Sequence, residues 1–321
     1  MIEGRHFRDV EARRRTIAEA IDRYIIEELP KKRDAATRRS RLMWWRQKLG
    51  HLKLAEVNAA TIVECRNKLL REPYVKAKPG AKGSTLAEGE APREFKRGPK
   101  TANRFLAYLS HAFTIARKEW HWIAHNPLDG VSKYKEGPGR VRYLSDDERS
   151  ALLEQTAKDL QLHLVVMLAL TTAARAGEIV GLMWRDVDLK EGRLLLRTTK
   201  NAQPRVLWVH GETLRLLKEH AKARQVDDER LFVSQTGKRY GYREAFQTAC
   251  VAAKVRGFHF HDLRHSAATY LAREGATEQQ LKAIGGWKSG VVSRYVHLAA
   301  QDARDVMARM NEKILGGSSS E

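Results

Sequence analysis

One arginine directly follows the most apolar stretch of the sequence. Residues 160–170 are mostly aliphatic, and a turn of small residues leads from them to Arg175 and, three positions later, to Glu178. Charged side chains are rarely buried unless they are paired, so an arginine in this setting needs an anion. The anion is either Glu178, in an ion pair that only stabilises the fold, or an anionic ligand.

A second set of polar residues opens a helix predicted over 261–274. His261 and Arg264 are three residues apart, which places a titratable group and a planar cation on one face near a helix N-terminus. Zinc is the alternative ligand, because His261 and His265 have the spacing of two ligands in a metallohydrolase helix, with Asp262 in place of the usual glutamate. The zinc hypothesis leaves the arginines without a role, and the sequence indicates no third ligand.

The segment 284–298 completes a pattern of six residue types in a fixed order. Each type would be weak evidence alone, but the set resembles the catalytic residues of the tyrosine recombinases, or phage integrases. That family has an arginine, a hairpin lysine, His-x-x-Arg, a histidine or tryptophan, and a nucleophilic tyrosine, in this order. The matching residues here are Arg175, Lys200, His261, Arg264, Trp287 and Tyr295.

Two positions depart from the family pattern. Trp287 and Tyr295 are 295 − 287 = 8 residues apart, one fewer than we expect for the family, so the loop before the tyrosine is tightened or the tyrosine is displaced. Ala174 occupies a position that glycine or a larger residue often fills, which affects packing more than chemistry. The short interval motivates an alternative function, that of a relative that binds DNA without cleaving it.

The resemblance implies that Tyr295 attacks a DNA phosphodiester and forms a 3′-phosphotyrosine link. His261 is expected to act as general base or as hydrogen-bond partner for Tyr295 or the phosphate. Lys200 is the expected general acid for the departing 5′-hydroxyl. Because the phosphotyrosine conserves the bond energy, a second 5′-hydroxyl can reverse the step, and we expect no ATP, metal ion or other cofactor.

The remaining matches are expected to bind and position the phosphate. Arg175 and Arg264 would clamp its non-bridging oxygens, because a planar guanidinium presents paired donors and keeps its charge. The indole N–H of Trp287 would donate one hydrogen bond to the phosphate, or the ring would pack against the tyrosine helix. Glu178 is expected to orient Arg175 or the histidine segment, and His265 to support the same site.

The charge of the chain favours a polyanionic partner. Its 321 residues include 59 Lys and Arg against 39 Asp and Glu, for a formal net charge of +20 and a pI near 10.0. Such a protein can bind nucleic acid through many phosphate contacts. The sequence has no apolar run of membrane-spanning length and no signal-peptide core, so we expect a protein of the bacterial cytoplasm or nucleoid. Cys65 and Cys250 are expected to be free, buried thiols.

Hydrophobic spacing predicts a mainly α-helical protein with a small β hairpin, an α+β fold of two domains. After a tail (1–14), residues 15–129 should form a helical domain that resembles the family's core-binding domain and carries a mobile basic insert at 73–100. A linker (130–142) should join it to the catalytic domain (143–321).

Caps and periodicity locate the elements. Capping boxes or caps are expected at Thr16 with Glu19, Ser145 with Glu148, and Asn58. Short β-type runs at 193–198 and 205–209 flank the turn that carries Lys200. Helices after the first are expected at 36–49, 59–71, 101–119, 160–170, 213–223, 243–253, 261–274, 278–284 and 302–315, the last before a flexible tail.

Positive charge is concentrated at 31–53, where nine Lys or Arg face one acid, Asp34, while Trp44 and Trp45 can anchor the helix. We expect one face of this helix to grip phosphate; a solvated charged face is the alternative. Basic residues of the insert and the linker would complete a C-shaped clamp around the duplex. The expected DNA contacts are Lys31, Lys32, Arg33, Arg38, Arg39, Arg41, Arg46, Lys48, Lys96, Arg97, Lys100, Lys133, Lys135, Arg140 and Arg142.

The expected partner is double-stranded DNA with attachment sites, bound by four copies of the chain, because recombination of two duplexes requires four strand cleavages. By resemblance, helix 302–315 would dock on a neighbouring copy, and host or phage DNA-bending proteins are further candidate partners. Few residues precede the first helix, so we expect the arm-binding domain of many phage integrases to be absent or removed. A type IB topoisomerase, which shares the chemistry without needing a specific site, is the remaining alternative.

Overall fold

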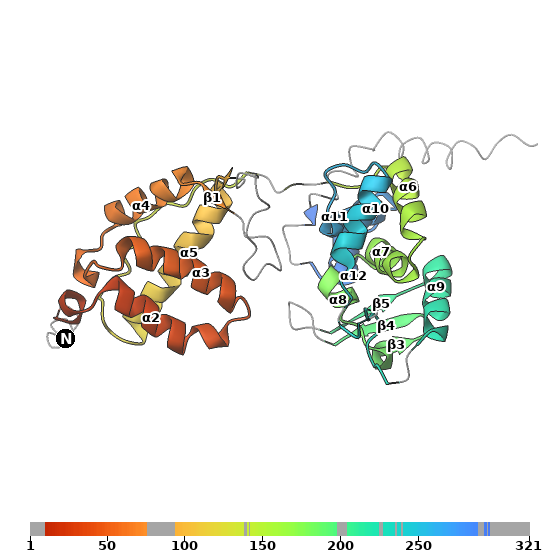
Figure 1. Cartoon of the computed structure of the whole chain (residues 1–321), viewed down its shortest axis with the longest axis horizontal. Helices are drawn as coiled ribbons and strands as arrows, with labels where there is room; N and C mark the ends of the chain where they lie inside the picture. The colour runs from red at the N-terminus through yellow and green to blue at the C-terminus, as the bar shows by residue number, and fades with distance from the viewer. Residues whose placement is uncertain are drawn as a thin grey trace, which may run out of the picture. The chain divides into compact units, whose positions relative to one another are not determined.

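The computed structural model describes residues 10–75, 94–137, 140, 142–197, 204–224, 227–234, 236–238, 240–287, 292, 293 and 295. The chain divides into two compact units, Met1–Pro138 and Gly139–Glu321 (Figure 1). Helices dominate the described part of both units, and the strands are few and short. The expectation of a mainly α-helical protein with a small sheet is confirmed.

The described part of the N-terminal unit is built on long helices and two short 3-10 turns. Their bounds are α2 (Ile17–Glu27), η1 (Leu29–Lys31), α3 (Ala35–Leu49), η2 (Leu54–Glu56), α4 (Ala59–Arg71) and α5 (Pro99–Lys118). Trp45 of α3 is fully buried, and its indole N–H donates to the Phe105 carbonyl of α5 at 3.0 Å. This contact holds the basic helix α3 on the unit's core.

Local interactions start α2 and α4 where the sequence predicts. The Thr16 hydroxyl accepts a hydrogen bond from the Glu19 N–H at 3.2 Å, and the Glu19 carboxylate accepts from the Thr16 N–H at 2.7 Å. Asn58 accepts from the Thr61 N–H at 3.0 Å and caps α4. Both predictions are confirmed, since a cap depends only on residues that are neighbours in sequence.

The segment expected to be a mobile insert differs from the expectation at both ends. Strand β1 (Tyr74–Val75) pairs antiparallel with β2 (Glu94–Phe95), and α5 already begins at Pro99. The guanidinium of Arg97 lies 4.6 Å from the centroid of the Tyr74 ring. Strands of two residues are too short to produce a hydrophobic alternation, which is why the sequence did not reveal them. Residues 76–93 lie outside the described part.

Residues 131–136, expected as the first half of a linker, are anchored on the N-terminal unit. Asn103 of α5 accepts from the Tyr134 N–H and donates to the Tyr134 carbonyl, both at 2.9 Å. The same amide donates to Glu136 at 2.9 Å. On α4, Arg66 donates to the Ser132 carbonyl, and its guanidinium lies 4.2 Å from the centroid of the Tyr134 ring. The chain therefore leaves this unit's packing no earlier than Glu136.

The described part of the C-terminal unit, which contains the expected catalytic domain, places a three-stranded sheet among helices. The elements are α6 (Asp146–Thr156), α7 (Leu160–Thr172), α8 (Ala176–Ile179), η3 (Trp184–Asp186), β3 (Val187–Asp188), β4 (Arg193–Leu196), β5 (Arg205–Trp208), α9 (Gly211–Lys222), α10 (Tyr242–Ala252), α11 (Phe260–Arg273) and α12 (Glu278–Gly285). The apolar helix α7 contacts α6, α9, α10 and α11 and lies at the centre of the core (Figure 1). The predicted capping box at Ser145 starts α6.

The predicted hairpin forms the larger part of the sheet, whose strand order is β3-β4-β5. All pairs are antiparallel, and Leu196 pairs with Arg205 at the end of the hairpin next to the turn. Strand β3 was not predicted, because it is only two residues long. Lys200 lies outside the described residues, as does the helix predicted at 302–315.

Candidate active site

Arg175 stands at a sharp turn between two helices. Ala173 ends α7 in the left-handed conformation (φ 53°), and Arg175 caps the short helix α8. Its side chain donates to the Glu178 carboxylate at 2.7 Å and its backbone N–H to the same group at 2.9 Å. A further bond runs from Arg175 to the Gly286 carbonyl at 3.2 Å. The ion pair with Glu178 exists, and it belongs to a larger network.

Arg205 of β5 is the member of this network that sequence reasoning missed. Its guanidinium donates to Glu178 at 2.7 Å and to the Gly285 carbonyl at 2.7 Å. The side chain is 11% exposed. Strand alternation could have revealed it, because Arg205 falls on the same face as Leu207, which is buried, while Val206 and Trp208 are exposed.

Glu178 is held as a carboxylate between two arginines. Burial alone would raise the pKa of Glu178, but hydrogen bonds from the backbone and side chain of Arg175 and the charge of Arg205 outweigh it, so the pKa is lowered. Glu178 therefore stays ionised at neutral pH. This placement agrees with the orienting role expected for Glu178.

Arg264 is buried, with 3% of its surface exposed. One guanidinium nitrogen donates to the Ala173 carbonyl, and Nη2 has no hydrogen-bond partner among the described residues. Burial, followed by the nearby charges of Arg175 and Arg205, lowers the pKa of Arg264 to about 9. Two guanidiniums thus pair with the Glu178 carboxylate and a third lies within electrostatic range of it, which leaves an excess of positive charge and a buried donor that suit an anion.

Trp287 packs directly on Arg264, whose guanidinium carbon lies 4.1 Å from the centroid of the indole ring. Two glycines at the end of α12 make this packing feasible. A Cβ on Gly285 would lie 1.9 Å from the Trp287 ring, and a Cβ on Gly286, which has φ +63°, would lie 2.0 Å from the Arg205 guanidinium. The Gly-Gly-Trp sequence therefore leaves room for the Trp287 ring, Arg264 and Arg205 to pack together at the end of α12.

Gly285→Ala is expected to push Trp287 off Arg264 and slow DNA cleavage by about 10- to 100-fold, because the ring would no longer hold the guanidinium. Overpacking should also lower the free energy of unfolding by about 1–3 kcal/mol. Gly241→Ala is the matched control, since a Cβ there meets nothing within 4 Å. If Gly285→Ala cleaves DNA at the wild-type rate, the packing of Trp287 on Arg264 is not needed for cleavage.

Tyr295 is fully buried, and its hydroxyl hydrogen-bonds to Nδ1 of His265. Its ring centroid lies 5.8 Å from that of His265 and 5.9 Å from that of Trp287. His261 stacks edge-on against His265, with ring centroids 5.2 Å apart, and is exposed. The short Trp287 to Tyr295 interval therefore still brings the tyrosine to the tryptophan, and His265, expected only to support the site, contacts the hydroxyl.

The same histidines were the basis of the zinc alternative. Among the residues that the structure describes, no three His, Cys, Asp or Glu side chains gather as a ligand set. Asp262, in the place of the metallohydrolase glutamate, accepts from the His259 N–H at 2.8 Å and pairs with Arg140 at 3.0 Å. The Asp262 carboxylate therefore caps the start of α11.

The sequence profile of the phage integrase family matches residues 142–302, half of the chain. The chain belongs to the phage integrase family. It is 34% identical over 198 residues to a shufflon-specific DNA recombinase of Escherichia coli (61% of this chain, 50% of the relative). It is 25% identical over 325 residues to the integrase of Salmonella phage P22 (91% and 79%). The chain thus spans half the length of the first of these relatives.

Solved structures share the fold of this phage integrase family member. A lambda integrase tetramer bound to a Holliday junction gives a TM-score of 0.64 at 20% identity, over 86% of this chain and 78% of that one. Such an identity shows the fold alone. Together with the family match, it confirms the expected kinship with the tyrosine recombinases.

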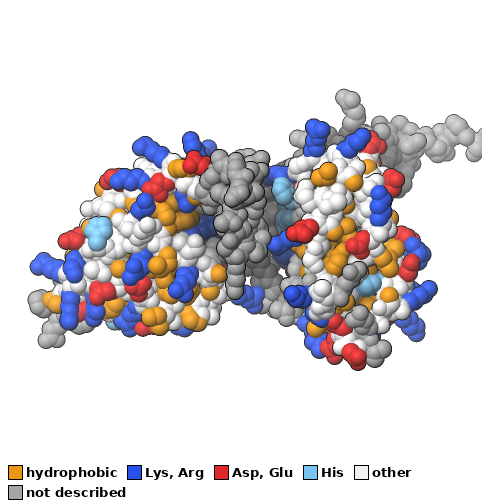
Figure 2. Space-filling model, in the orientation of Figure 1, with side chains coloured by type: hydrophobic (Ala, Val, Ile, Leu, Met, Phe, Trp, Pro, Cys, Tyr) orange, Lys and Arg blue, Asp and Glu red, His pale blue; other side chains and the backbone are white. Residues whose placement is uncertain are grey.

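The basic helix α3 is less one-sided than its sequence suggests. Acids outside the helix pair with several of its residues: Asp22 with Arg46 (2.8 Å), Glu72 with Lys48 (2.7 Å) and Asp34 with Arg38 (2.7 Å). Lys31 of η1, which precedes the helix, pairs with Glu28 (2.6 Å). Figure 2 shows basic side chains interspersed with acidic ones on the face that it presents. The exposed Arg33 and Arg39 form no ion pair within the described part of the chain. They remain the clearest candidates for phosphate contacts.

The two described arginines of the expected linker's second half also have partners within the catalytic unit. Arg140 donates to the Gly257 carbonyl and pairs with Asp262 at the start of α11. Arg142 forms two bonds with Glu148, one at 2.8 Å, and lies over the Phe258 ring. Arg140 and Arg142 therefore bind to groups of α6 and of the start of α11, and this part of the chain does not behave as a free basic linker.

Arg39→Gln and Arg140→Gln should differ in how DNA affinity depends on salt. Arg39→Gln is expected to reduce the slope of log K against log[salt] by about one, because one phosphate contact is lost. Arg140→Gln should leave the slope unchanged, because its partners are protein groups. Fluorescence anisotropy titrations with duplex DNA at several salt concentrations measure both slopes. A reduced slope for Arg140→Gln would mean that Arg140 contacts phosphate.

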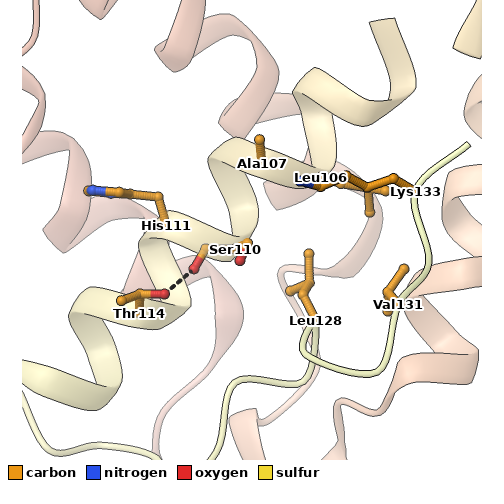
Figure 3. A pocket seen from close by; sticks show the side chains of 8 residues that line it. All are labelled: Leu106, Ala107, Ser110, His111, Thr114, Leu128, Val131 and Lys133. Carbon is orange, nitrogen blue, oxygen red and sulfur yellow. Dashed lines mark hydrogen bonds between the residues drawn. The ribbon is translucent and has the colours of Figure 1, made fainter. Parts of the chain in front are cut away.

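A pocket of about 330 Å³ in the N-terminal unit contains only one of the expected site residues, Lys133 (Figure 3). It lies between α5 and the segment that carries Leu128 and Val131. Three of its polar side chains have internal partners: Thr114 donates to the Ser110 carbonyl at 2.8 Å, His111 hydrogen-bonds to Tyr24 at 2.9 Å, and the Ser110 hydroxyl accepts from Asn126 at 3.3 Å. We assign no chemistry to it.

No helix among the described residues has both the length and the apolar character needed to cross a bilayer.

Proposed function

We propose that the chain is a site-specific DNA recombinase that cleaves and rejoins DNA through a 3′-phosphotyrosine at Tyr295, and that it integrates or excises a phage or another mobile element. The observation that carries this proposal is the group of Arg175, Arg205 and Arg264 around one carboxylate. Tyr295 packs against the tryptophan that stacks on Arg264.

Cleavage of a phosphodiester places additional negative charge on the non-bridging oxygens in the transition state. Arg264 presents a buried nitrogen without a protein partner in the described structure, and Arg175 is 24% exposed by its side chain. Arg175 can donate to a phosphate oxygen from its exposed side, and Arg264 is proposed to donate once DNA binding opens access to its buried nitrogen. The proposed roles of these two arginines rest on this excess of positive charge.

The proposed cleavage step transfers the phosphorus from the 5′-oxygen to Tyr295. The Tyr295 oxygen forms a bond to phosphorus, the bond from phosphorus to the 5′-oxygen breaks, and the electron pair leaves with that oxygen. His265 is in contact with the phenol and can take its proton, and His261 is proposed to assist at the phosphate. Lys200 is proposed to protonate the departing 5′-oxygen. Attack by another 5′-hydroxyl reverses these changes without ATP or a metal ion.

We propose that four copies act on two duplexes in a bacterial cell, with helix 302–315 docked on a neighbouring copy. The lambda integrase structure of the same fold is a tetramer on a Holliday junction, which supports this assembly. DNA-bending proteins of the host or phage are proposed accessory partners.

A nicked suicide duplex tests the proposal. The attachment site can be identified by sequencing the DNA that flanks the gene, where direct repeats beside a tRNA gene would indicate an integrating element. The full chain should form a covalent complex with this duplex that survives denaturant and forms equally in the presence of a chelator. Binding without a trapped complex would favour the relative that binds DNA without cleaving it. Relaxation of any supercoiled plasmid would favour a type IB topoisomerase.

A further inference from the structure

Arg205 is largely buried, lies at the end of β5 that is next to the hairpin turn, and contacts two separate parts of the site. Its two terminal nitrogens donate to Glu178 and to the Gly285 carbonyl, each at 2.7 Å. Glu178 belongs to α8 and Gly285 is the last residue of α12. One guanidinium therefore ties strand β5 to two helices that carry or seat the phosphate-binding groups.

Arg205 also shares the negative charge of Glu178 with Arg175. Glu178 accepts from both Arg175 and Arg205, so neither arginine alone neutralises it. Without Arg205, the carboxylate would pair with Arg175 only. Arg175 would then be fully occupied by a protein anion, and its charge would be less available to a phosphate.

We propose that Arg205 is a positioning residue for the phosphate site. It acts through Glu178, which it shares with Arg175, and through the Gly285 carbonyl, which fixes the end of α12 below Trp287. Arg205 is expected to have no contact with the DNA itself. This inference rests on the proposed recombinase function.

A cycle of charge-neutralising variants distinguishes this role from simple packing. In single-turnover cleavage of the suicide duplex at saturating protein, R205Q is expected to be slower than the wild type by on the order of 100-fold, with little change in DNA affinity. Removing the competing carboxylate should partly restore the rate, so the double variant R205Q with E178Q should be about 10-fold faster than R205Q alone. A purely structural role predicts a double variant no faster than R205Q.

Controls keep the cycle interpretable. R193Q is the matched control, because Arg193 lies on the adjacent strand of the same sheet in a half-exposed pair with Asp188, and it should cleave like the wild type. Rates are normalised to the folded fraction from near-ultraviolet circular dichroism, and R205M replaces R205Q in the cycle if R205Q folds poorly. Wild-type cleavage by R205Q, or no recovery in the double variant, overturns the inference alone. A wild type that traps no complex overturns the proposed function and the inference with it.

Discussion

Replacing Tyr295 with phenylalanine is expected to reduce covalent complex formation on the suicide duplex by at least about 10⁴-fold, to background. The phenyl ring has no oxygen that could attack phosphorus. It fills the same buried space among Ala268, Leu281 and Val292, and it loses one hydrogen bond, to His265. Denaturing gel electrophoresis of the trapped complex measures the effect.

The buried position of Tyr295 makes a matched control necessary. Tyr270→Phe removes a hydroxyl from α11 that donates to the Leu144 carbonyl at 2.9 Å, which is a structural contact in the same unit. This variant should trap DNA within a few-fold of the wild type. Equal trapping by Tyr295→Phe and the wild type would mean that another residue is the nucleophile.

Arg264→Met is expected to slow cleavage by on the order of 10³-fold, since a buried donor to the developing charge is lost. The same change should not lower the midpoint of thermal unfolding. Burial in the fold lowers the pKa of Arg264 to about 9, so the fold disfavours the charged form. At neutral pH the side chain is charged in both the folded and the unfolded state, so the buried charge lowers the free energy of unfolding. Removing this charge is expected to offset the loss of packing on Trp287.

A large drop in the unfolding midpoint of Arg264→Met would show instead that Arg264 is a structural tie. Cleavage at the wild-type rate would remove it from the phosphate site. Arg149→Met offers a control of similar size, because Arg149 forms a surface pair with Asp146 and lies over the Tyr270 ring. It should affect neither measurement strongly.

Features that depend on neighbours in sequence were predictable. The capping boxes at Thr16 and Ser145, the cap at Asn58 and the apolar helix α7 lie where the sequence places them. The kinship with the tyrosine recombinases also followed from six residue types in order, which needs no knowledge of their contacts. The pair of Arg175 with Glu178, three residues apart, was equally local.

Features that depend on contacts distant in sequence were harder to predict. Arg205 reaches Glu178 across 27 residues and Gly285 across 80, and only its place on the inner face of a strand indicated burial. His265 was weighed as a zinc ligand, although its Nδ1 contacts the hydroxyl of Tyr295, 30 residues away. The charge of 31–53 was counted within that segment alone, and apart from Asp34 the acids that pair with it come from outside.

The residue that becomes joined to DNA in the trapped complex identifies the nucleophile. The trapped complex can be digested with a protease and a nuclease, and the modified peptide sequenced by mass spectrometry. We expect a nucleotide joined through its 3′-phosphate to Tyr295, and a free 5′-hydroxyl on the released strand. A nucleotide on any other residue, or a link through a 5′-phosphate, would contradict it.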